Sequence, residues 1–333
     1  MRNWLATLFN KIWYGRSFLS YLLLPLSWLY ALIVNIRQVA YQQGIFKIQF
    51  VDVPVIIVGN ITVGGTGKTP LVIWLIKFLR ENGYKPGIVI RGYGGRDSRF
   101  TQQVRPDSDP ATVGDEAIMH AQRCNCPISV NRDRVEAARS LLEHTDCDII
   151  ISDDGLQHYA LGRDVEIAVI DGIRRLGNRR YLPAGPLRES EKRLDGVDFI
   201  VTQGVPARGE YSMSLHGKMA RNLYDEKISR GLDSFVGKNI HAVTAIGNPA
   251  KFFTHLKTSG LTFKEHEFVD HYVFRESDLD FGEDAEILMT EKDAVKCRRF
   301  ARTNYWYVPV EAKLNENFGP RLLELLKKRT PNG

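Results

Sequence analysis

A glycine-rich turn beside a lysine and a threonine is the segment of this chain best suited to binding phosphate. The sequence VGNITVGGTGKTP occupies residues 58–70, directly after an apolar run. Backbone N–H groups of such a turn can surround phosphate oxygens, Lys68 can reach the β- and γ-phosphates, and Thr69 can ligate Mg²⁺. The common P-loop pattern has a first glycine where this chain has Thr62, so the G-G-x-G-K-T variant fits better. The predicted nucleotide-binding residues are Thr62, Val63, Gly64, Gly65, Thr66, Gly67, Lys68 and Thr69.

Two adjacent aspartates end a second apolar run, CDIIISDDGLQH, at residues 147–158. P-loop enzymes use carboxylates at a strand end to hold Mg²⁺ and its water. Asp153 or Asp154 is therefore the expected metal partner of Thr69, and the sequence does not choose between them. The alternative for paired aspartates at a strand end is capping of a following helix.

Further charged residues follow other apolar runs or precede helical stretches. RGYGGR at 91–96 places Arg91 where it suits an anionic group, although an ordinary glycine turn is the alternative. VGDEA at 113–117 offers Asp115 and Glu116 at a helix start, where helix capping competes with function. DHY at 270–272 contains His271, and a lone histidine is more often structural than catalytic. The motifs NRDR at 131–134 and LPAGPLRE at 182–189 add Arg132, Arg134, Arg188 and Glu189. The candidate substrate-binding residues are Arg91, Arg132, Arg188 and Glu189.

From residue 53 onward, apolar runs alternate with amphipathic stretches, which is typical of βαβ units and a parallel sheet. Ligands bind at the carboxyl ends of such strands, where these motifs lie. We expect a P-loop type α/β domain with helices on both faces of its sheet at 46–204, a linker that can hold a hairpin at 205–235, and a smaller α/β domain at 236–330. The strands expected in the larger domain are 54–59, 87–91, 127–130, 147–152, 165–170 and 198–202.

The first 50 residues contain five basic residues, no acidic residue and eleven aromatic residues, which favours contact with a membrane surface. Twenty uncharged residues at 17–36 would form a helix about 30 Å long, just enough to span a bilayer. Pro25 lies at the centre of this run and would bend the helix. Residues 1–45 are therefore expected to form membrane-anchoring helices. An interfacial helix pair, a single span and a buried apolar helix all remain open, and the positive-inside tendency favours the interfacial pair.

Composition excludes several classes of protein. At 333 residues the chain has room for about two domains, and 44% hydrophobic with 25% charged residues is typical of a folded protein. The net charge is +6, but no basic stripe runs through the body, which argues against nucleic-acid binding. Four cysteines, among them the C-N-C pair at 124–126, match neither a zinc knuckle nor a disulfide framework, so a reducing compartment is expected.

Taken together, the motifs resemble one family of lipid kinases. GNITVGGTGKTP, RGYGGR, GDEA, DDGLQH, LPAGPLRE, DHY and TEKDAVK occur in this order after an apolar N-terminal segment. This combination resembles the tetraacyldisaccharide 4′-kinases of the lipid A pathway over about residues 15–310. DDGLQH and LPAGPLRE are the specific elements of the resemblance.

The resemblance implies transfer of the γ-phosphate of ATP, with Mg²⁺, to the 4′-hydroxyl of a tetraacylated glucosamine disaccharide 1-phosphate, which gives lipid IVA. It implies work at the cytoplasmic face of the bacterial inner membrane, and no obligate protein partner. The catalytic carboxylate and histidine of the family map by motif onto Asp115 and His271. Lys68 would hold the γ-phosphate, and Arg91, Arg132 or Arg188 would bind the 1-phosphate.

Two other classes compete with this reading. A membrane-recruited nucleotide switch of the G-G-x-G-K-T type usually has a lysine before the two glycines, where this chain has Val63. A P-loop kinase for a soluble sugar or cofactor would leave the N-terminal anchor without a purpose.

Overall fold

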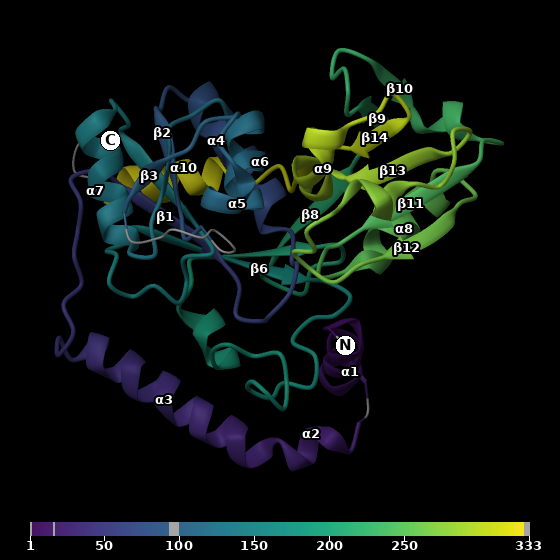
Figure 1. Ribbon diagram of the computed structural model, residues 1–333. Coiled ribbons are helices and arrows are strands. Elements are labelled where there is room, and N and C mark those ends of the chain that lie inside the picture. Colours follow the sequence, from purple (N-terminus) through teal and green to yellow (C-terminus); the bar gives the residue numbers. More distant parts are fainter. Residues whose placement is uncertain (1, 16, 93–99, 330–333) are drawn as a thin grey trace.

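Two β-sheets with their helices make up the body of the molecule, and three N-terminal helices lie beside them (Figure 1). The computed structural model describes residues 2–15, 17–92 and 100–329. The α/β class expected from the alternation of apolar and amphipathic segments is confirmed.

The first sheet has nine strands in the order β15-β8-β7-β6-β1-β5-β2-β4-β3. The strands from β8 to β4 are parallel, and β15 and β3 run antiparallel at the two edges. The six expected strands are all present, shifted by one or two residues at most of their ends. Their bounds are β1 (Val55–Gly59), β2 (Pro86–Ile90), β3 (Gln102–Gln103), β4 (Ile128–Val130), β5 (Ile149–Asp153), β6 (Val165–Asp171), β7 (Phe199–Gln203), β8 (Tyr211–His216) and β15 (Glu311–Leu314).

Helices cover both faces of this sheet, because its central strands are apolar on both sides. In β1, Ile56 and Val58 join one core cluster, which also contains side chains of α4, α6 and α10. Val55 and Ile57 join the opposite cluster, which contains α7. The helices of this domain are α4 (Lys68–Glu81), α5 (Pro110–Val113), α6 (Asp115–Cys124), α7 (Arg134–His144), α10 (Phe318–Arg329) and the short η1 (Glu191–Gly196).

The second sheet has six strands in the order β10-β9-β14-β13-β11-β12, all from the segment between β8 and β15. The strands from β14 to β12 are parallel, and β9 and β10 are antiparallel to their neighbours. The elements are β9 (Met219–Asn222), β10 (Ser229–Gly231), η2 (Leu232–Phe235), β11 (Ile240–Thr244), α8 (Pro249–Thr258), β12 (Lys264–Glu267), η3 (Glu276–Leu279), β13 (Glu286–Thr290), α9 (Glu291–Cys297), η4 (Arg298–Phe300) and β14 (Tyr305–Val308).

Sheet membership differs from the division expected from the sequence at two places. The segment expected as a linker at 205–235 contributes β8 to the first sheet and the antiparallel pair β9 and β10 to the second. Residues 311–329, expected in the smaller domain, return to the first sheet: the strand β15, which was not expected, pairs with β8, and α10 buries Leu322 and Leu326 in the first core. Amphipathic spacing indicates which face of a helix is buried, but not which sheet it covers.

The return of α10 leads to a stability prediction. Phe318 is fully buried, with ring centroids 5.6 Å from Trp74, 5.3 Å from Phe199 and 5.4 Å from Tyr211. Phe318→Ala should lower the free energy of unfolding by about 3–5 kcal/mol, because a large cavity would open in the core. Urea unfolding followed by circular dichroism measures this loss. A loss below about 1 kcal/mol would mean that α10 contributes little to the first domain.

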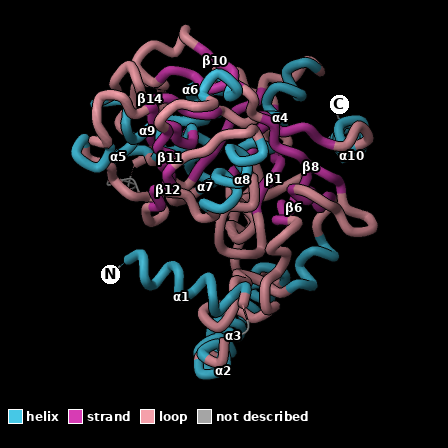
Figure 2. The backbone as a smooth tube through the Cα atoms, turned by 90° about the vertical axis from the view of Figure 1, so that its right-hand side faces the viewer, coloured by secondary structure: helices cyan, strands magenta, loops and turns pink. Residues whose placement is uncertain are grey.

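The three N-terminal helices lie along one side of the first domain (Figure 2). They are α1 (Arg2–Tyr14), α2 (Leu19–Leu22) and α3 (Leu24–Gln42). Pro25 falls in the first turn of α3, where proline fits without breaking a hydrogen bond, so the interruption comes before it and not inside a helix. The Trp13 indole N–H donates to the carbonyl of Pro183 at 2.9 Å, and the Ser27 hydroxyl donates to that of Tyr181 at 2.6 Å. No described helix has the length and apolar character needed to cross a bilayer.

Candidate active site

A cleft of ≈ 1420 Å³ opens at the carboxyl ends of the central parallel strands. Its walls come from the glycine-rich turn after β1, the ends of β2 and β5, the second domain, and residues of α3. Lys68, Thr69, Asp153, Asp154 and His271 therefore line one space. Asp115 does not line it but lies beside it, in contact with His271. Of the RGYGGR motif, only Arg91 and Gly92 lie within the described residues.

The turn between β1 and α4 has the backbone needed to surround an anion. Gly64 and Gly67 have φ of 114° and 96°, values that residues other than glycine rarely adopt. A Cβ at Gly67 would lie 3.0 Å from the side-chain ends of Gln203 and Met213, which would have to shift to make room for it. Helix α4 begins at Lys68 directly after Gly67, which directs its free N–H groups and the positive end of its dipole toward the cleft. The seven predicted nucleotide-binding residues at 63–69 all line the cleft.

Thr62 plays a different structural part from the rest of the run. It is buried and its backbone bridges to Leu187. The next amide, that of Val63, donates to the carbonyl of Pro186 at 2.9 Å. The first residues of the turn are thus attached to the LPAGPLRE segment, and residues after them face the cleft.

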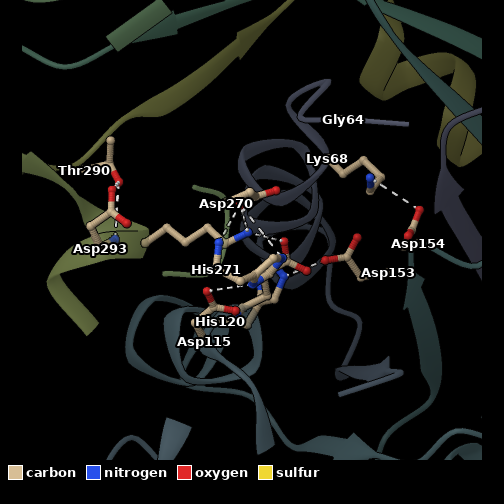
Figure 3. A network of polar contacts seen from close by, with 12 residues as sticks. Gly64, Lys68, Asp115, His120, Asp153, Asp154, Asp270, His271, Thr290 and Asp293 are labelled. Atoms are coloured by element: carbon tan, nitrogen blue, oxygen red, sulfur yellow. Dashed lines mark hydrogen bonds and ion pairs between the residues drawn. The ribbon is translucent and has the colours of Figure 1, made fainter. Parts of the chain in front are cut away.

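Asp154 is held by two cations. Its carboxylate lies 3.3 Å from Lys68 Nζ (Figure 3). Arg188 Nη1 lies 3.0 Å from both of its oxygens. Burial opposes ionisation, but Lys68 and Arg188 hold the pKa of Asp154 well below its usual range. The backbone at Asp154 is left-handed, with φ of 51°, a conformation that costs energy outside glycine and is often found at functional sites.

Asp153 has a different partner. Its Oδ2 lies 2.8 Å from Nε2 of His120, and both side chains are buried. Burial alone would lower the pKa of His120, but the carboxylate raises it to about 10. Behind this strand end, the buried Arg134 guanidinium donates to the carbonyls of Asp153 and Asp154 at 3.1 and 3.0 Å. Arg134, considered in the sequence with the anion-binding arginines, therefore holds the backbone that carries both aspartates.

Asp115 and His271 meet across the two domains. Asp115 is the first residue of α6, and its Oδ2 lies 3.2 Å from Nδ1 of His271 (Figure 3). The other carboxylate oxygen accepts the Glu116 backbone N–H at 3.0 Å, so Asp115 satisfies the helix start with one oxygen and faces the histidine with the other. His271 has a left-handed backbone, with φ of 59°. The pair therefore exists only when the second domain is docked on α6.

In this pair the pKa of Asp115 is lowered and the pKa of His271 is raised. Burial opposes ionisation of Asp115, but the hydrogen bond from His271 and the nearby Lys292 and Lys296 lower its pKa to about 2. The same hydrogen bond raises the pKa of His271 above its usual 6.5, against the effect of burial. Asp115 is therefore a carboxylate throughout the physiological range, and His271 is its titrating neighbour.

The TEKDAVK motif supplies the support for this pair. It forms the junction of β13 and α9, where the buried Asp293 accepts hydrogen bonds from Thr244 and Thr290 at 3.1 and 2.6 Å. Lys296 Nζ lies 2.8 Å from Asp293 and 4.0 Å from Asp115. Lys292 Nζ lies 3.0 Å from Glu116. The motif thus presents two cations to the start of α6.

The remaining predicted residues divide into two groups. Arg91 and Arg132 are exposed and line the cleft, so they are available to an anionic ligand. Glu189 is buried, accepts a hydrogen bond from Gln157 at 2.7 Å and lies 3.3 Å from Arg193. These contacts indicate that Glu189 stabilises the loop that carries it.

Comparison with known proteins shows the family of this chain. The sequence profile of the tetraacyldisaccharide-1-P 4′-kinase family matches residues 19–327. The chain belongs to this family. A tetraacyldisaccharide 4′-kinase of Nitrosococcus oceani is 52% identical over 323 residues, which cover 97% of this chain and 95% of the relative. The enzyme of the same name from Legionella pneumophila strain Lens is 46% identical and covers 93% of this chain and 94% of its own.

A solved kinase structure has the same fold. A crystal structure of LpxK from Aquifex aeolicus in complex with ATP superposes with a TM-score of 0.79 at 29% identity. The match covers 94% of this chain and 99% of the other. The family resemblance predicted from the motifs is confirmed.

In this family member, sequence reasoning missed three groups of the site. His120 lies in a helical stretch, where a lone histidine gives no signal of its own. Arg134 belongs to a run of charged residues that is typical of an exposed segment, so no local pattern indicated that its side chain is buried. Lys292 and Lys296 stood in a motif quoted for the family resemblance, but nothing in the sequence showed that α9 would pack against α6.

Proposed function

We propose that this chain is an ATP-dependent kinase that phosphorylates the 4′-hydroxyl of tetraacyldisaccharide 1-phosphate, the lipid A precursor, to give lipid IVA. The observation that carries the proposal is that Lys68 and the Asp115–His271 pair line or adjoin one cleft. Phosphoryl transfer depends on positioning and on neutralising phosphate charge, and this cleft offers groups for both.

The triphosphate is bound by the glycine-rich turn. The N–H groups of Gly64 to Gly67 and the start of α4 surround the phosphates, and Lys68 contacts the γ-phosphate. The γ-phosphate points toward Asp153 and Asp115, because these are the groups able to take up metal and proton. The part of the cleft that would take the nucleoside is lined by Gln203 of β7, Met213 and Leu215 of β8, and Lys251 and Phe252 of α8.

The residues present fit a Mg²⁺ ion. Within the described residues no three His, Cys, Asp or Glu side chains form a closed metal site, but Mg²⁺ needs only one or two protein carboxylates beside substrate phosphates. The buried Oδ1 of Asp153 has no hydrogen-bond partner, whereas Asp154 is engaged by Lys68 and Arg188. Asp153 and the Thr69 hydroxyl would hold the ion, and Asp154 orients Lys68. When bound, Mg²⁺ neutralises charge on the transferring phosphate.

Asp115 accepts the proton of the sugar hydroxyl. It is ionised, and His271 and Lys296 fix the orientation of its carboxylate. While His271 is an imidazolium, the carboxylate is a weak base. Loss of that proton raises the basicity of Asp115 and leaves Nδ1 able to share the incoming proton.

This coupling gives a pH prediction. Because the pKa of His271 is raised above 6.5, the active form with neutral His271 increases as the pH rises through that higher value. We expect kcat at saturating ATP and Mg²⁺ to rise with pH, with a midpoint above 6.5, and His271→Gln to remove this dependence. Steady-state rates between pH 5.5 and 9 measure it. An unchanged pH dependence in His271→Gln would assign the titration to another group.

The acceptor carries a 1-phosphate and four acyl chains. Arg91 and Arg132 are the proposed ligands of the phosphate, because both are exposed at the cleft; Arg188 is engaged with Asp154. The acyl chains meet α3, whose Tyr30, Val34 and Arg37 line the same cleft.

We place the protein at the cytoplasmic face of the inner membrane, attached through α1–α3 at the interface. This placement is supported by a row of exposed apolar side chains on α2 and α3. These are Leu19, Tyr21, Leu22, Leu26, Trp28, Leu29, Leu32, Ile33, Ile36 and Val39. Basic and aromatic residues beside an apolar helical face favour interfacial binding.

Transfer of labelled γ-phosphate from ATP to a tetraacyldisaccharide 1-phosphate in detergent micelles tests the proposed function. We expect a labelled lipid product that is lost when Mg²⁺ is chelated. ATP binding without transfer, together with nucleotide-dependent dimerisation, would instead indicate a switch protein. Phosphorylation of a soluble sugar without lipid would indicate a different kinase.

A further inference from the structure

The two oxygens of the Asp153 carboxylate have different surroundings. Oδ2 lies 2.8 Å from Nε2 of His120. Oδ1 is buried and has no hydrogen-bond partner among the described residues, although Asp153 lines the cleft. A carboxylate held through one oxygen with the other left open suits a metal ligand, since ligating carboxylates are themselves hydrogen-bonded by residues behind them.

His120 has no access to the cleft or to solvent. It is 0% exposed, on the part of α6 that packs into the first core beside Ile118 and Ala121. Leaving a polar group buried without a partner costs about 1–3 kcal/mol. An apolar residue would fill such a position without that cost, so the contact with Asp153 is what the imidazole adds there.

The contact fixes the direction of the free oxygen. Rotation of the Asp153 carboxylate is limited by the hydrogen bond to His120, while Arg134 holds the backbone carbonyls of Asp153 and Asp154. Helix α6 also begins with Asp115. One rigid helix therefore sets the positions of the proton acceptor and, through His120, of the oxygen proposed to bind metal (Figure 3).

We propose that His120 is a positioning residue for the divalent cation, acting through Asp153 without touching metal or nucleotide. The proposal rests on the metal role of Asp153 in the proposed function. Replacing residues behind a metal ligand typically lowers metal affinity or activity by 10–100-fold. The same size of effect is expected here.

The test compares side chains that can and cannot reach Asp153. His120→Leu removes the donor, whereas the amide nitrogen of His120→Gln takes the place of Nε2. The affinity for Mn²⁺ is measured by electron paramagnetic resonance on the full chain with a non-hydrolysable ATP analogue. We expect binding about 10–100-fold weaker in His120→Leu and recovery to within a few-fold of wild type in His120→Gln. The Mg²⁺ concentration that gives half-maximal kcat should shift in parallel.

His241→Leu serves as the matched control. His241 is also buried, but it lies in β11, contacts His266 at 3.0 Å and does not line the cleft. Its replacement should leave Mn²⁺ affinity unchanged. Thermal melting of all variants separates loss of folding from loss of metal binding.

Wild-type Mn²⁺ affinity in His120→Leu, or equal weakening in His120→Leu and His120→Gln, would overturn the proposal. If His120→Leu does not fold, His120→Asn replaces it, because its amide is one methylene shorter and falls short of Asp153. Equal affinities of the Asn and Gln variants would then be the negative result. Asp153→Asn separates failure of the proposed metal site from failure of the His120 proposal. If Asp153→Asn binds Mn²⁺ as tightly as wild type, Asp153 is not a metal ligand. If Asp153→Asn binds Mn²⁺ weakly while His120→Leu binds it normally, Asp153 keeps its metal role and only the positioning role of His120 is wrong.

Discussion

Lys68→Ala should lower kcat by at least a hundredfold. Lys68 is the cation that the P-loop brings to the γ-phosphate, and loss of one group that stabilises transition-state charge typically costs a factor of 10²–10³. The substitution also leaves Asp154 with Arg188 as its remaining cationic side-chain partner at contact distance among the described residues. Initial rates of labelled phosphate transfer at saturating ATP and lipid measure the loss.

Lys77→Ala is the matched control for this substitution. Lys77 lies on the same helix α4 but is exposed to solvent. Its replacement by alanine therefore removes the same charge without altering the cleft. It should retain wild-type activity. If Lys68→Ala kept more than about a tenth of kcat, a loss below ~1.4 kcal/mol, contact with the γ-phosphate would be the wrong role for this lysine.

Asp115→Asn should lower kcat by about 10²–10⁴-fold, the usual contribution of a positioned general base. The amide has the shape of the carboxylate and keeps an oxygen for the Glu116 N–H, so α6 should still begin at this residue. It cannot accept the proton of the sugar hydroxyl. The KM for ATP should change little, because Asp115 lies apart from the glycine-rich turn.

Asp107→Asn provides the comparison, since Asp107 is an exposed aspartate eight residues earlier. Equal melting temperatures of the two variants would show that the fold is intact. Unchanged kcat in Asp115→Asn would remove this residue as the base and leave His271 as the candidate acceptor.

Local features of the sequence predicted the first sheet well. Strand β1, the glycine-rich turn and α4 follow from a run of apolar residues, from glycines that permit positive φ, and from helical spacing, all of which are encoded within a few residues. The carboxyl-end rule then indicated where Asp153 and Asp154 would lie. Their different roles were not predictable, because they depend on Lys68, Arg188 and His120, which come from three separate parts of the chain.

The tertiary partners explain the remaining differences. The apolar face of α10 could have covered either sheet, and only the pairing of β15 with β8 decides which. The link between Asp115 and His271 crosses 156 positions of the sequence and needs the packing of α9 on α6. Only the family resemblance pointed to that pair, since spacing along the chain contains no trace of it.

The position of the second sheet between β8 and β15 has a consequence for the origin of the kinase. His216 of β8 and Glu311 of β15 are directly paired, so the chain leaves and re-enters the first domain at neighbouring points. Residues 217–310 are thus an insertion into the tip of a hairpin, and the nine-stranded sheet would close with a short turn in their place. A single recombination event could add or remove residues 217–310 without changing the strand order of the nucleotide-binding domain. Because His271, Lys292 and Lys296 all lie within this insertion, such an event would add or remove the partners of Asp115 together.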